Sequence, residues 1–538
     1  VETTIALHYV FDSPRDKIVY DVSHQSYPHK ILTGRKEGFT TDEGMSKISG
    51  YTNPDESEHD FFKVGHTSTS VSLACGLAKA RDLKGEKHNV IAVIGDGSLS
   101  GGEALEGLSN AAVLGSNIIV IVNDNEMSIA ENHGGLYQNL KELRDTEGRS
   151  SCNFFRSLGL DYLYVGEGND IPSLIAAFAK VKDTSRPTVV HIHTQKGKGY
   201  APAEADREEF HWEMPFDLET GKPKVDCSGM EDYHSLTGKF LLEKMKEDHT
   251  VVAISSGTPT VIGFTPERRK QAGRQFVDVG IAEEHAVALA SGIAAGGGRP
   301  VYGVYSTFIQ RCYDQLSQDL CINGNPAVIT VFMGTVAGMN DVTHLGFFDI
   351  PLISNIPNMV YLAPTCSEEY FAMLEWAVRQ TEYPVAIRVP GAAVVHRKEE
   401  FDTDYSELNR YKMTARGETV AILALGAFYD LGQALKNKLR EESGVEATLI
   451  NPRYITGLDE PMLEELKVGH RIVVTLEDGV LDGGFGEKIA RYYGNSEMRV
   501  LNYGLRKEFA DRYNLDELMK ANRLTDKQMA EDIAGILE

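Results

Sequence analysis

Two short polar segments contain the residues of this chain that are best suited to bind a metal ion together with a phosphate group. Gly95-Asp96-Gly97-Ser98 and Asn123-Asp124-Asn125 each follow a run of apolar residues, and the second segment ends 30 residues after the first begins. That interval accommodates a strand, a helix and a second strand. Because the carboxyl ends of neighbouring parallel strands meet at one edge of a sheet, we expect Asp96 and Asn125 to converge.

The chemistry expected of these two segments is the binding of Mg²⁺ and a diphosphate. Magnesium prefers near-octahedral oxygen coordination by one or two side chains together with phosphates and water. One carboxylate and one amide oxygen meet that need, and Gly95 and Gly97 let the backbone approach the phosphates closely. A Gly-Asp-Gly segment by itself is more often only a turn. Its pairing with Asn-Asp-Asn at this spacing favours the metal site.

Short apolar runs alternate with longer amphipathic segments along the whole chain, a pattern that predicts α/β architecture with mainly parallel sheets. The strands are expected at 90–94, 118–122, 189–192, 251–255, 326–332, 385–389, 419–425, 447–450, 471–476 and 500–503, and helices at 101–114 and 284–295. Polar segments at 203–230 and 394–408 are expected to be linkers. We therefore predict three domains, each a mainly parallel sheet flanked by helices, at 1–225, 226–395 and 410–538.

Composition excludes several classes of partner. The chain has 538 residues and a formal charge of −24, which argues against non-specific binding to nucleic acid or to an anionic membrane. No run approaches the roughly 18 apolar residues of a membrane span, so we expect neither a membrane-spanning helix nor a secretory signal within the given sequence. Six cysteines without a CxxC pair predict reduced thiols and a cytoplasmic protein. Because the chain begins with Val1 rather than Met, we expect further residues upstream.

Several longer segments resemble the 1-deoxy-D-xylulose-5-phosphate synthase family of the transketolase superfamily, whose members use thiamine diphosphate. The matching segments are Tyr20–Gln25, Tyr27–Arg35, Glu56–Asp60, Val64–Ser70, Asn123–Ile129, Ile281–Val287 and Tyr305–Arg311. They cover the first two predicted domains, and the third is only weakly similar. The resemblance implies a transketolase-like fold and a homodimer.

The resemblance also implies roles for individual residues. Mg²⁺ would be bound by Asp96, Asn125 and the carbonyl of Met127. The residues implied to contact thiamine diphosphate are His66, Gly95, Gly97, Ser98, Ile129, Lys196 and Phe308. The substrate pocket would be lined by Tyr305, Arg311, His24 and His344, with the two histidines and Glu283 as catalytic groups.

The implied reaction is the decarboxylation of pyruvate on the cofactor, followed by transfer of the two-carbon unit to an aldehyde, glyceraldehyde 3-phosphate in the family. The cofactor supplies the electron sink. Glu283 would contact its aminopyrimidine ring and would need a raised pKa or a shared proton, which burial provides. The plain alternatives are a helix-start carboxylate for Glu283, a core side chain for Phe308, and buried structural histidines for His24, His66 and His344.

The chain departs from the family at two positions. Met333 and Gly391 stand where the family has arginines that bind the phosphate of the aldehyde, and neither residue replaces a guanidinium group. Arg311 and Arg388 are the nearest candidates to take over that role. Two alternatives follow: a related transferase with a different aldehyde acceptor, or a cofactor-binding protein of low activity.

Overall fold

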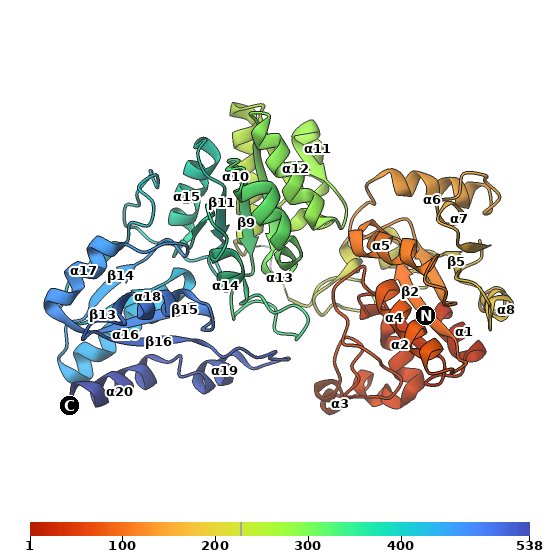
Figure 1. Ribbon diagram of the computed structural model, residues 1–538, viewed down its shortest axis with the longest axis horizontal. Helices are drawn as coiled ribbons and strands as arrows, with labels where there is room; N and C mark the ends of the chain where they lie inside the picture. The colour runs from red at the N-terminus through yellow and green to blue at the C-terminus, as the bar shows by residue number, and fades with distance from the viewer. Residues whose placement is uncertain (226–228) are drawn as a thin grey trace. The chain divides into compact units, whose positions relative to one another are not determined.

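The computed structural model describes residues 1–225 and 229–538, with the side chain of His24 outside that description. The chain forms two compact units. The first contains Val1–Gly229 with Val279–Ala282, and the second contains Met230–Asp278 with Glu283–Glu538. The first unit has one sheet and the second has two (Figure 1).

The sheet of the first unit is parallel throughout and buried on both faces. Its strands, in spatial order, are β1 (Lys17–Tyr20), β2 (Val90–Gly95), β3 (Ile119–Asp124), β5 (Thr188–His193) and β4 (Asp161–Val165). Alternate residues of β2 point to opposite faces: Ala92 and Ile94 pack in one core cluster, and Ile91 and Val93 in the other. This explains why the strand is a continuous apolar run.

Helices cover both faces of this sheet. One core cluster includes residues of α4 (Ser70–Leu83) and α5 (Gly102–Ala111), and the other includes residues of α1 (Glu2–Val10) and α8 (Ile171–Val181). The remaining helices of the unit are α2 (Tyr27–Lys30), α3 (Asp42–Lys47), α6 (Gly135–Asp145), α7 (Phe154–Ser157) and α9 (Ala201–Ala205).

The second unit begins with a six-stranded parallel sheet. Its spatial order is β10 (Val360–Leu362), β11 (Val385–Arg388), β9 (Val328–Phe332), β8 (Arg299–Tyr305), β6 (Val251–Ser255) and β7 (Phe276–Asp278). Its helices are α10 (Tyr233–Glu247), α11 (Pro266–Ala272), α12 (Glu283–Ala295), α13 (Ser306–Ile309), α14 (Asp349–Ser354) and α15 (Ser367–Arg379).

A five-stranded mixed sheet completes the second unit. Its order is β12 (Lys412–Ala415), β14 (Thr448–Asn451), β13 (Thr419–Ala424), β15 (His470–Val480) and β16 (Arg499–Leu505), with β12 antiparallel to β14. Its helices are α16 (Tyr429–Ser443), α17 (Glu460–Gly469), α18 (Phe485–Tyr493), α19 (Leu515–Ala521) and α20 (Asp526–Leu537). Val336, Leu345 and Phe347, from the segment after β9, pack in the core of this sheet and so join it to the preceding one.

The predicted α/β architecture with mainly parallel sheets is confirmed, while several element bounds differ. β15 runs to Val480, beyond the predicted end at 476, because its last residues are also buried. Six strands were not predicted. In β1, β7, β10 and β12, three or four residues give too little pattern to identify, and the longer strands β4 and β8 were also missed. Cys227 lies outside the described residues, and the five cysteines within them are free.

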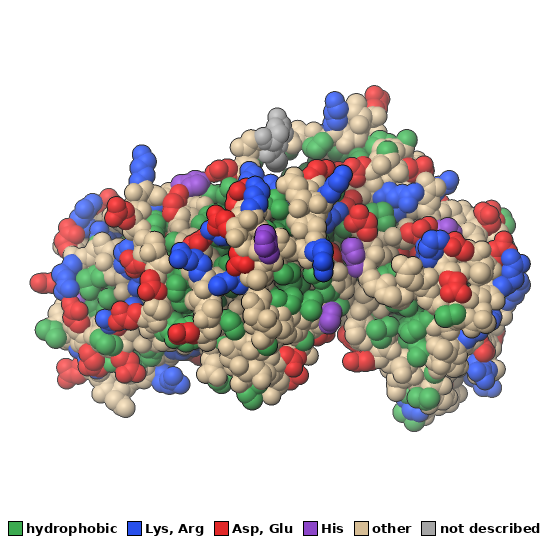
Figure 2. Space-filling model, turned by 90° about the horizontal axis from the view of Figure 1, so that it is seen from above, with side chains coloured by type: hydrophobic (Ala, Val, Ile, Leu, Met, Phe, Trp, Pro, Cys, Tyr) green, Lys and Arg blue, Asp and Glu red, His purple; other side chains and the backbone are tan. Residues whose placement is uncertain are grey.

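The surface carries charges of both signs. On the face shown in Figure 2, acidic and basic side chains are interspersed over the molecule. Within the described parts of the chain, every helix is too short or too polar to cross a membrane.

Candidate active site

The two polar segments singled out in the sequence meet at neighbouring strand ends. β2 and β3 pair in parallel with Gly95 opposite Asn123, and the N–H of Asp96 donates to the carbonyl of Asn123 at 3.0 Å. The backbone N–H of Asn125 is near enough to the Asp96 carboxylate to act on its pKa. The two segments therefore lie side by side at the ends of neighbouring strands, as predicted, and the Oδ1 atom of Asn125 accepts a hydrogen bond from the N–H of Met127 at 3.2 Å. The role of Asp96 and Asn125 as metal ligands stays a prediction.

Asp96 is a buried carboxylate with neutral hydrogen-bond partners. Only 1% of the residue is exposed. Burial raises its pKa well above the ordinary value, and the nearby charge of Asp124 adds to that effect. Asn132 and the backbone N–H groups of Asn125 and Gly97 act in the opposite direction but carry no charge. A bound cation at this point would compensate the Asp96 charge.

Asp124 directly precedes the predicted ligand Asn125 in the chain, but its own role is structural. Its carboxylate contacts Arg144 Nη1 at 2.6 Å and His191 Nε2 at 2.8 Å, all three groups being largely buried. Burial raises the pKa of Asp124, but the hydrogen bonds and charges of His191 and Arg144 outweigh burial and lower it to about 2. Asp124 thus holds the end of β3 in place and is already paired.

A tight loop that contains Ile129 lies against Gly97, and Lys196 hydrogen-bonds this loop. Met127 and Glu131 form an antiparallel bridge that closes the loop. A Cβ atom at Gly97 would lie 2.8 Å from Cβ of Ser128, so only glycine permits this approach. The Lys196 ammonium donates to the carbonyl of Ser128 at 2.6 Å. Burial lowers the pKa of Lys196 to about 8.

Asp21 ties three loops of the first unit together, and sequence reasoning missed it. It directly follows β1, is fully buried, and accepts hydrogen bonds from the N–H groups of Ser68 at 2.8 Å and Ser70 at 2.9 Å. The Ser68 hydroxyl donates to the carbonyl of Ser98 at 2.8 Å. The loop of His66 is thereby fastened to the Asp96 turn.

His24 is three residues from Asp21, at the start of a 3₁₀ turn (His24–Ser26). The position of its side chain lies outside the described structure, so its predicted substrate role stays a prediction.

The sequence did contain one signal that could have identified Asp21. It lies in the matching segment Tyr20–Gln25, directly after a short strand.

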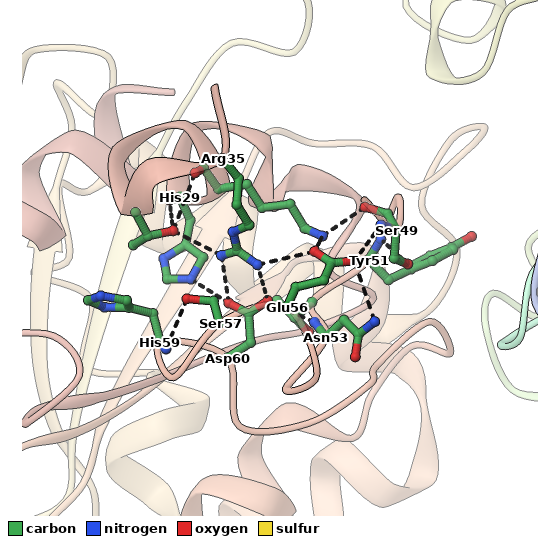
Figure 3. A network of polar contacts seen from close by, with 12 residues as sticks. His29, Arg35, Ser49, Tyr51, Asn53, Glu56, Ser57, His59 and Asp60 are labelled. Atoms are coloured by element: carbon green, nitrogen blue, oxygen red, sulfur yellow. Dashed lines mark hydrogen bonds and ion pairs between the residues drawn. The ribbon is translucent and has the colours of Figure 1, made fainter. Parts of the chain in front are cut away.

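Two further matching segments, Tyr27–Arg35 and Glu56–Asp60, bind each other through a buried ionic network (Figure 3). Lys30 Nζ lies 2.7 Å from Glu56, and Arg35 Nη1 and His29 Nε2 lie 2.6 and 2.8 Å from the Asp60 carboxylate. Burial raises the pKa of Asp60, but His29 and Arg35 outweigh burial and hold it well below its usual range. This network therefore joins the two segments and stabilises the chain between β1 and α4.

In the second unit, Glu283 is the first residue of α12 and is buried. Burial raises its pKa, and the charge of Arg311 partly opposes that rise. Arg311 Nη1 lies 3.5 Å from Glu283 Oε2, which is too far for a strong hydrogen bond. A raised pKa favours the protonated form of this carboxyl group, as the predicted catalytic role requires.

The other predicted residues of this unit lie together. The Phe308 ring contacts the ring of His344 edge-on at 5.7 Å and that of Tyr305 at 5.8 Å. His344 Nδ1 lies 3.2 Å from Oδ1 of Asp341. Phe308 is in α13 and Arg311 follows in the adjoining 3₁₀ turn (Gln310–Cys312), so an aromatic cluster and an acid–guanidinium pair are neighbours.

The interpretation that Arg388 could bind a substrate phosphate is wrong. Arg388 is 4% exposed and forms two hydrogen bonds to Asp349, at 2.8 and 3.0 Å, and one to the carbonyl of Asp478 at 2.6 Å. Its guanidinium group is buried and bonded to other residues of the protein, so it does not face a substrate. Of the two candidates, Arg311 alone remains for the role of the missing arginines.

Comparisons with known proteins identify the same family along most of the chain. A family model described as 1-deoxy-D-xylulose-5-phosphate synthase matches residues 1–153, the transketolase pyrimidine binding domain matches 231–394, and the transketolase C-terminal domain matches 410–529. The 1-deoxy-D-xylulose-5-phosphate synthase of Desulforudis audaxviator is 38% identical over 544 residues, covering 94% of this chain and 85% of the relative.

A second relative and one solved structure complete the comparison. The 1-deoxy-D-xylulose-5-phosphate synthase of Caldanaerobacter subterraneus is 38% identical over 579 residues, covering 99% of this chain and 91% of the relative. A transketolase from Campylobacter jejuni is 15% identical with a TM-score of 0.48, covering 99% of this chain and 94% of that one.

Proposed function

The chain belongs to the 1-deoxy-D-xylulose-5-phosphate synthase family, and from this we propose that it decarboxylates pyruvate and transfers the two-carbon unit to glyceraldehyde 3-phosphate. The near full-length similarity to relatives of that name supports the proposal. The observation that carries it in the structure is the meeting of Asp96 and Asn125 at the ends of β2 and β3. The enzyme is a thiamine-diphosphate-dependent transferase.

We propose Mg²⁺ as the metal that holds the cofactor. Asp96, Asn125 and the carbonyl of Met127 would bind it, with His66, Gly95, Ser98 and Lys196 near the diphosphate. Two observations support the fit. The Asp96 carboxylate is buried and its hydrogen-bond partners are neutral, and the side-chain oxygen of neighbouring Asn132 is buried without a hydrogen-bond partner among the described residues. A hydrated cation would neutralise the charge of the carboxylate, and its water would donate a hydrogen bond to the amide oxygen.

The residues of the second unit would transfer protons and orient the cofactor and the substrate. When bound, thiamine diphosphate supplies the electron sink for decarboxylation. Glu283, buried and with a raised pKa, would hold a proton against the pyrimidine ring of the cofactor. Phe308 would provide an apolar face, and His344, oriented by Asp341, would exchange a proton with substrate.

A steady-state assay tests the proposal. We expect the purified enzyme, with thiamine diphosphate and Mg²⁺, to convert pyruvate and glyceraldehyde 3-phosphate to 1-deoxy-D-xylulose 5-phosphate. Unphosphorylated glyceraldehyde should react with a lower kcat/KM. Equal kcat/KM values for the two aldehydes would instead support a different acceptor. Absence of pyruvate-dependent carbon dioxide release would support a cofactor-binding protein of low activity.

We propose further that the enzyme is a homodimer in the cytoplasm. The homodimer rests on family resemblance, and the location rests on the free state of the described cysteines. Light scattering coupled to size exclusion tests the first: a mass equal to one 59.3 kDa chain would contradict it.

A further inference from the structure

We propose that Asn132 is a positioning residue of the metal site, which orients the Asp96 carboxylate and accepts a hydrogen bond from a water molecule bound to Mg²⁺. This inference rests on the proposed function, because it presumes that Mg²⁺ and thiamine diphosphate bind at Asp96. Asn132 was not among the predicted site residues. Two separate observations point to it.

The first observation is the bond between the two side chains. Nδ2 of Asn132 donates to Oδ2 of Asp96 at 2.7 Å, the length of a charge-assisted hydrogen bond. The orientation of the amide follows from chemistry, since the opposite orientation would place the amide oxygen against a carboxylate oxygen. The bond therefore fixes the rotation of the carboxylate that is proposed to bind the metal.

The second observation is the other end of the same amide. Oδ1 of Asn132 is buried and has no hydrogen-bond partner in the described structure. A buried acceptor without a partner costs about 1–3 kcal/mol, so such groups in folded proteins commonly mark the place of a water or an ion. With its donor end held by Asp96, Asn132 presents an acceptor close to the proposed metal.

A metal-bound water is the donor that best fits this acceptor. Mg²⁺ gives up its water reluctantly and usually keeps several water ligands in protein sites. Those waters are polarised by the ion and donate strongly. Residues that hydrogen-bond the ligands of a metal commonly set its affinity, and their loss typically costs 10–100-fold in affinity.

The local fold brings Asn132 to this position. The loop that starts at Asn125 and contains Met127 turns back through the Met127–Glu131 bridge, and Asn132 is the next residue. In the adjoining helix α6, the Tyr137 hydroxyl donates to the carbonyls of Asp96 at 3.1 Å and Gly97 at 3.3 Å. One continuous segment thus contains two predicted metal ligands and two residues that hold the Asp96 turn.

The alternative is a purely structural hydrogen bond. In that case, removal of the Asn132 amide would lower the stability of the apoprotein and leave its Mg²⁺ requirement unchanged. The two roles differ in the Mg²⁺ concentration at which thiamine diphosphate binds, a quantity that is measured without turnover.

The test is a calorimetric titration of thiamine diphosphate at a series of Mg²⁺ concentrations, for the wild type, Asn132→Ala and the volume-conserving Asn132→Leu. We expect both variants to need about 10–100-fold more Mg²⁺ for half-maximal cofactor binding. Asn139→Ala is the matched control. Asn139 lies on α6 and its amide bonds Cys152 and Phe154 rather than Asp96, so its Mg²⁺ requirement should equal that of the wild type.

The outcomes separate this inference from the proposed function. A wild type that shows no Mg²⁺-dependent binding of thiamine diphosphate would overturn the proposed function. A wild type that binds, with a folded Asn132→Ala or Asn132→Leu whose Mg²⁺ requirement stays within about twofold, would overturn the role of Asn132 alone. Urea unfolding of each apoprotein shows which variants are folded.

Discussion

Arg388 and Asp349 form a two-pronged ion pair in the interior of the second unit. Nε and Nη2 of Arg388 lie 2.8 and 3.0 Å from the two oxygens of Asp349, and the Tyr361 hydroxyl also donates to Asp349. Nη2 further donates to the carbonyl of Asp478, so a residue of β11 is fastened to β15. Arg388 therefore links the second and third sheets, and substrate cannot displace it without a large cost in stability.

Replacement of Arg388 by methionine is expected to destabilise the enzyme by about 3–5 kcal/mol, because it leaves Asp349 buried without its cation. Urea unfolding monitored by circular dichroism measures this loss. Arg311→Met is the comparison: Arg311 is partly exposed and should affect aldehyde kinetics with little loss of stability. An Arg388→Met enzyme of normal stability but raised KM for glyceraldehyde 3-phosphate would restore Arg388 as a substrate ligand.

Met333→Arg is expected to strengthen binding of the phosphorylated aldehyde. A charged hydrogen bond to phosphate is worth about 1.5–3 kcal/mol, so the KM for glyceraldehyde 3-phosphate should fall by roughly tenfold or more. Met333 already has a positive φ of 55°, so arginine adds no new backbone strain there. Met339→Arg, in the same connecting segment, is the matched control. An equal change in both variants would show a general charge effect instead.

Sequence patterns identified the proposed metal ligands but missed the residues that hold their loops in place. Asp96 and Asn125 were found because each follows a long apolar strand whose end is evident in the sequence. Asp21 and Asn132 were missed because each acts through a hydrogen bond to a residue at least 36 positions away, Ser68 or Asp96. The local pattern of apolar and polar residues cannot identify a hydrogen-bond partner so far away in the sequence.

The error at Arg388 has the same origin. An arginine just after or at the end of a strand near a predicted site is a reasonable phosphate ligand until its partners are known. Asp349 lies 39 residues earlier in the chain, and only the packed structure brings the two together. Family resemblance predicted which segments belong to the active site. The structure adds which side chains of those segments are bonded to other parts of the protein, as Arg388 is.

Glu283→Gln is expected to lower kcat by about 10²–10⁴-fold, because glutamine keeps the shape of the side chain but cannot take up or release a proton. The wild-type pKa is raised by burial, so a neutral amide should leave the unfolding free energy unchanged or higher. Glu284→Gln, at the adjacent position, is the control and should retain its activity. A Glu283→Gln enzyme within about tenfold of wild-type kcat would remove the proton-transfer role from this residue.

Asp96→Asn is expected to abolish Mg²⁺-dependent binding of thiamine diphosphate in calorimetry. The same change removes a buried charge whose hydrogen-bond partners are neutral, so the apoprotein should be at least as stable as the wild type in a thermal melt. Stability and cofactor binding should thus move in opposite directions. A variant that binds cofactor with unchanged affinity at the same Mg²⁺ concentration would exclude Asp96 as a metal ligand.

Lys196 should make both stability and cofactor binding depend on pH above neutrality. Burial lowers its pKa to about 8 in the folded protein, against about 10.4 in an unfolded chain. Between these values the unfolded chain binds more protons than the folded one, so the Lys196 contribution to the unfolding free energy rises with pH in that window. Below pH 8 the buried ammonium carries its full cost in stability.

Cofactor binding should show the opposite trend, because only the charged ammonium attracts a diphosphate. Near pH 9, binding of thiamine diphosphate is therefore expected to take up a proton at Lys196. Calorimetry in buffers of different ionisation enthalpy measures that uptake, and Lys196→Met should reduce it while Lys198→Met, two residues further on, should not. Identical proton uptake by the wild type and Lys196→Met would show that this lysine does not contact the diphosphate.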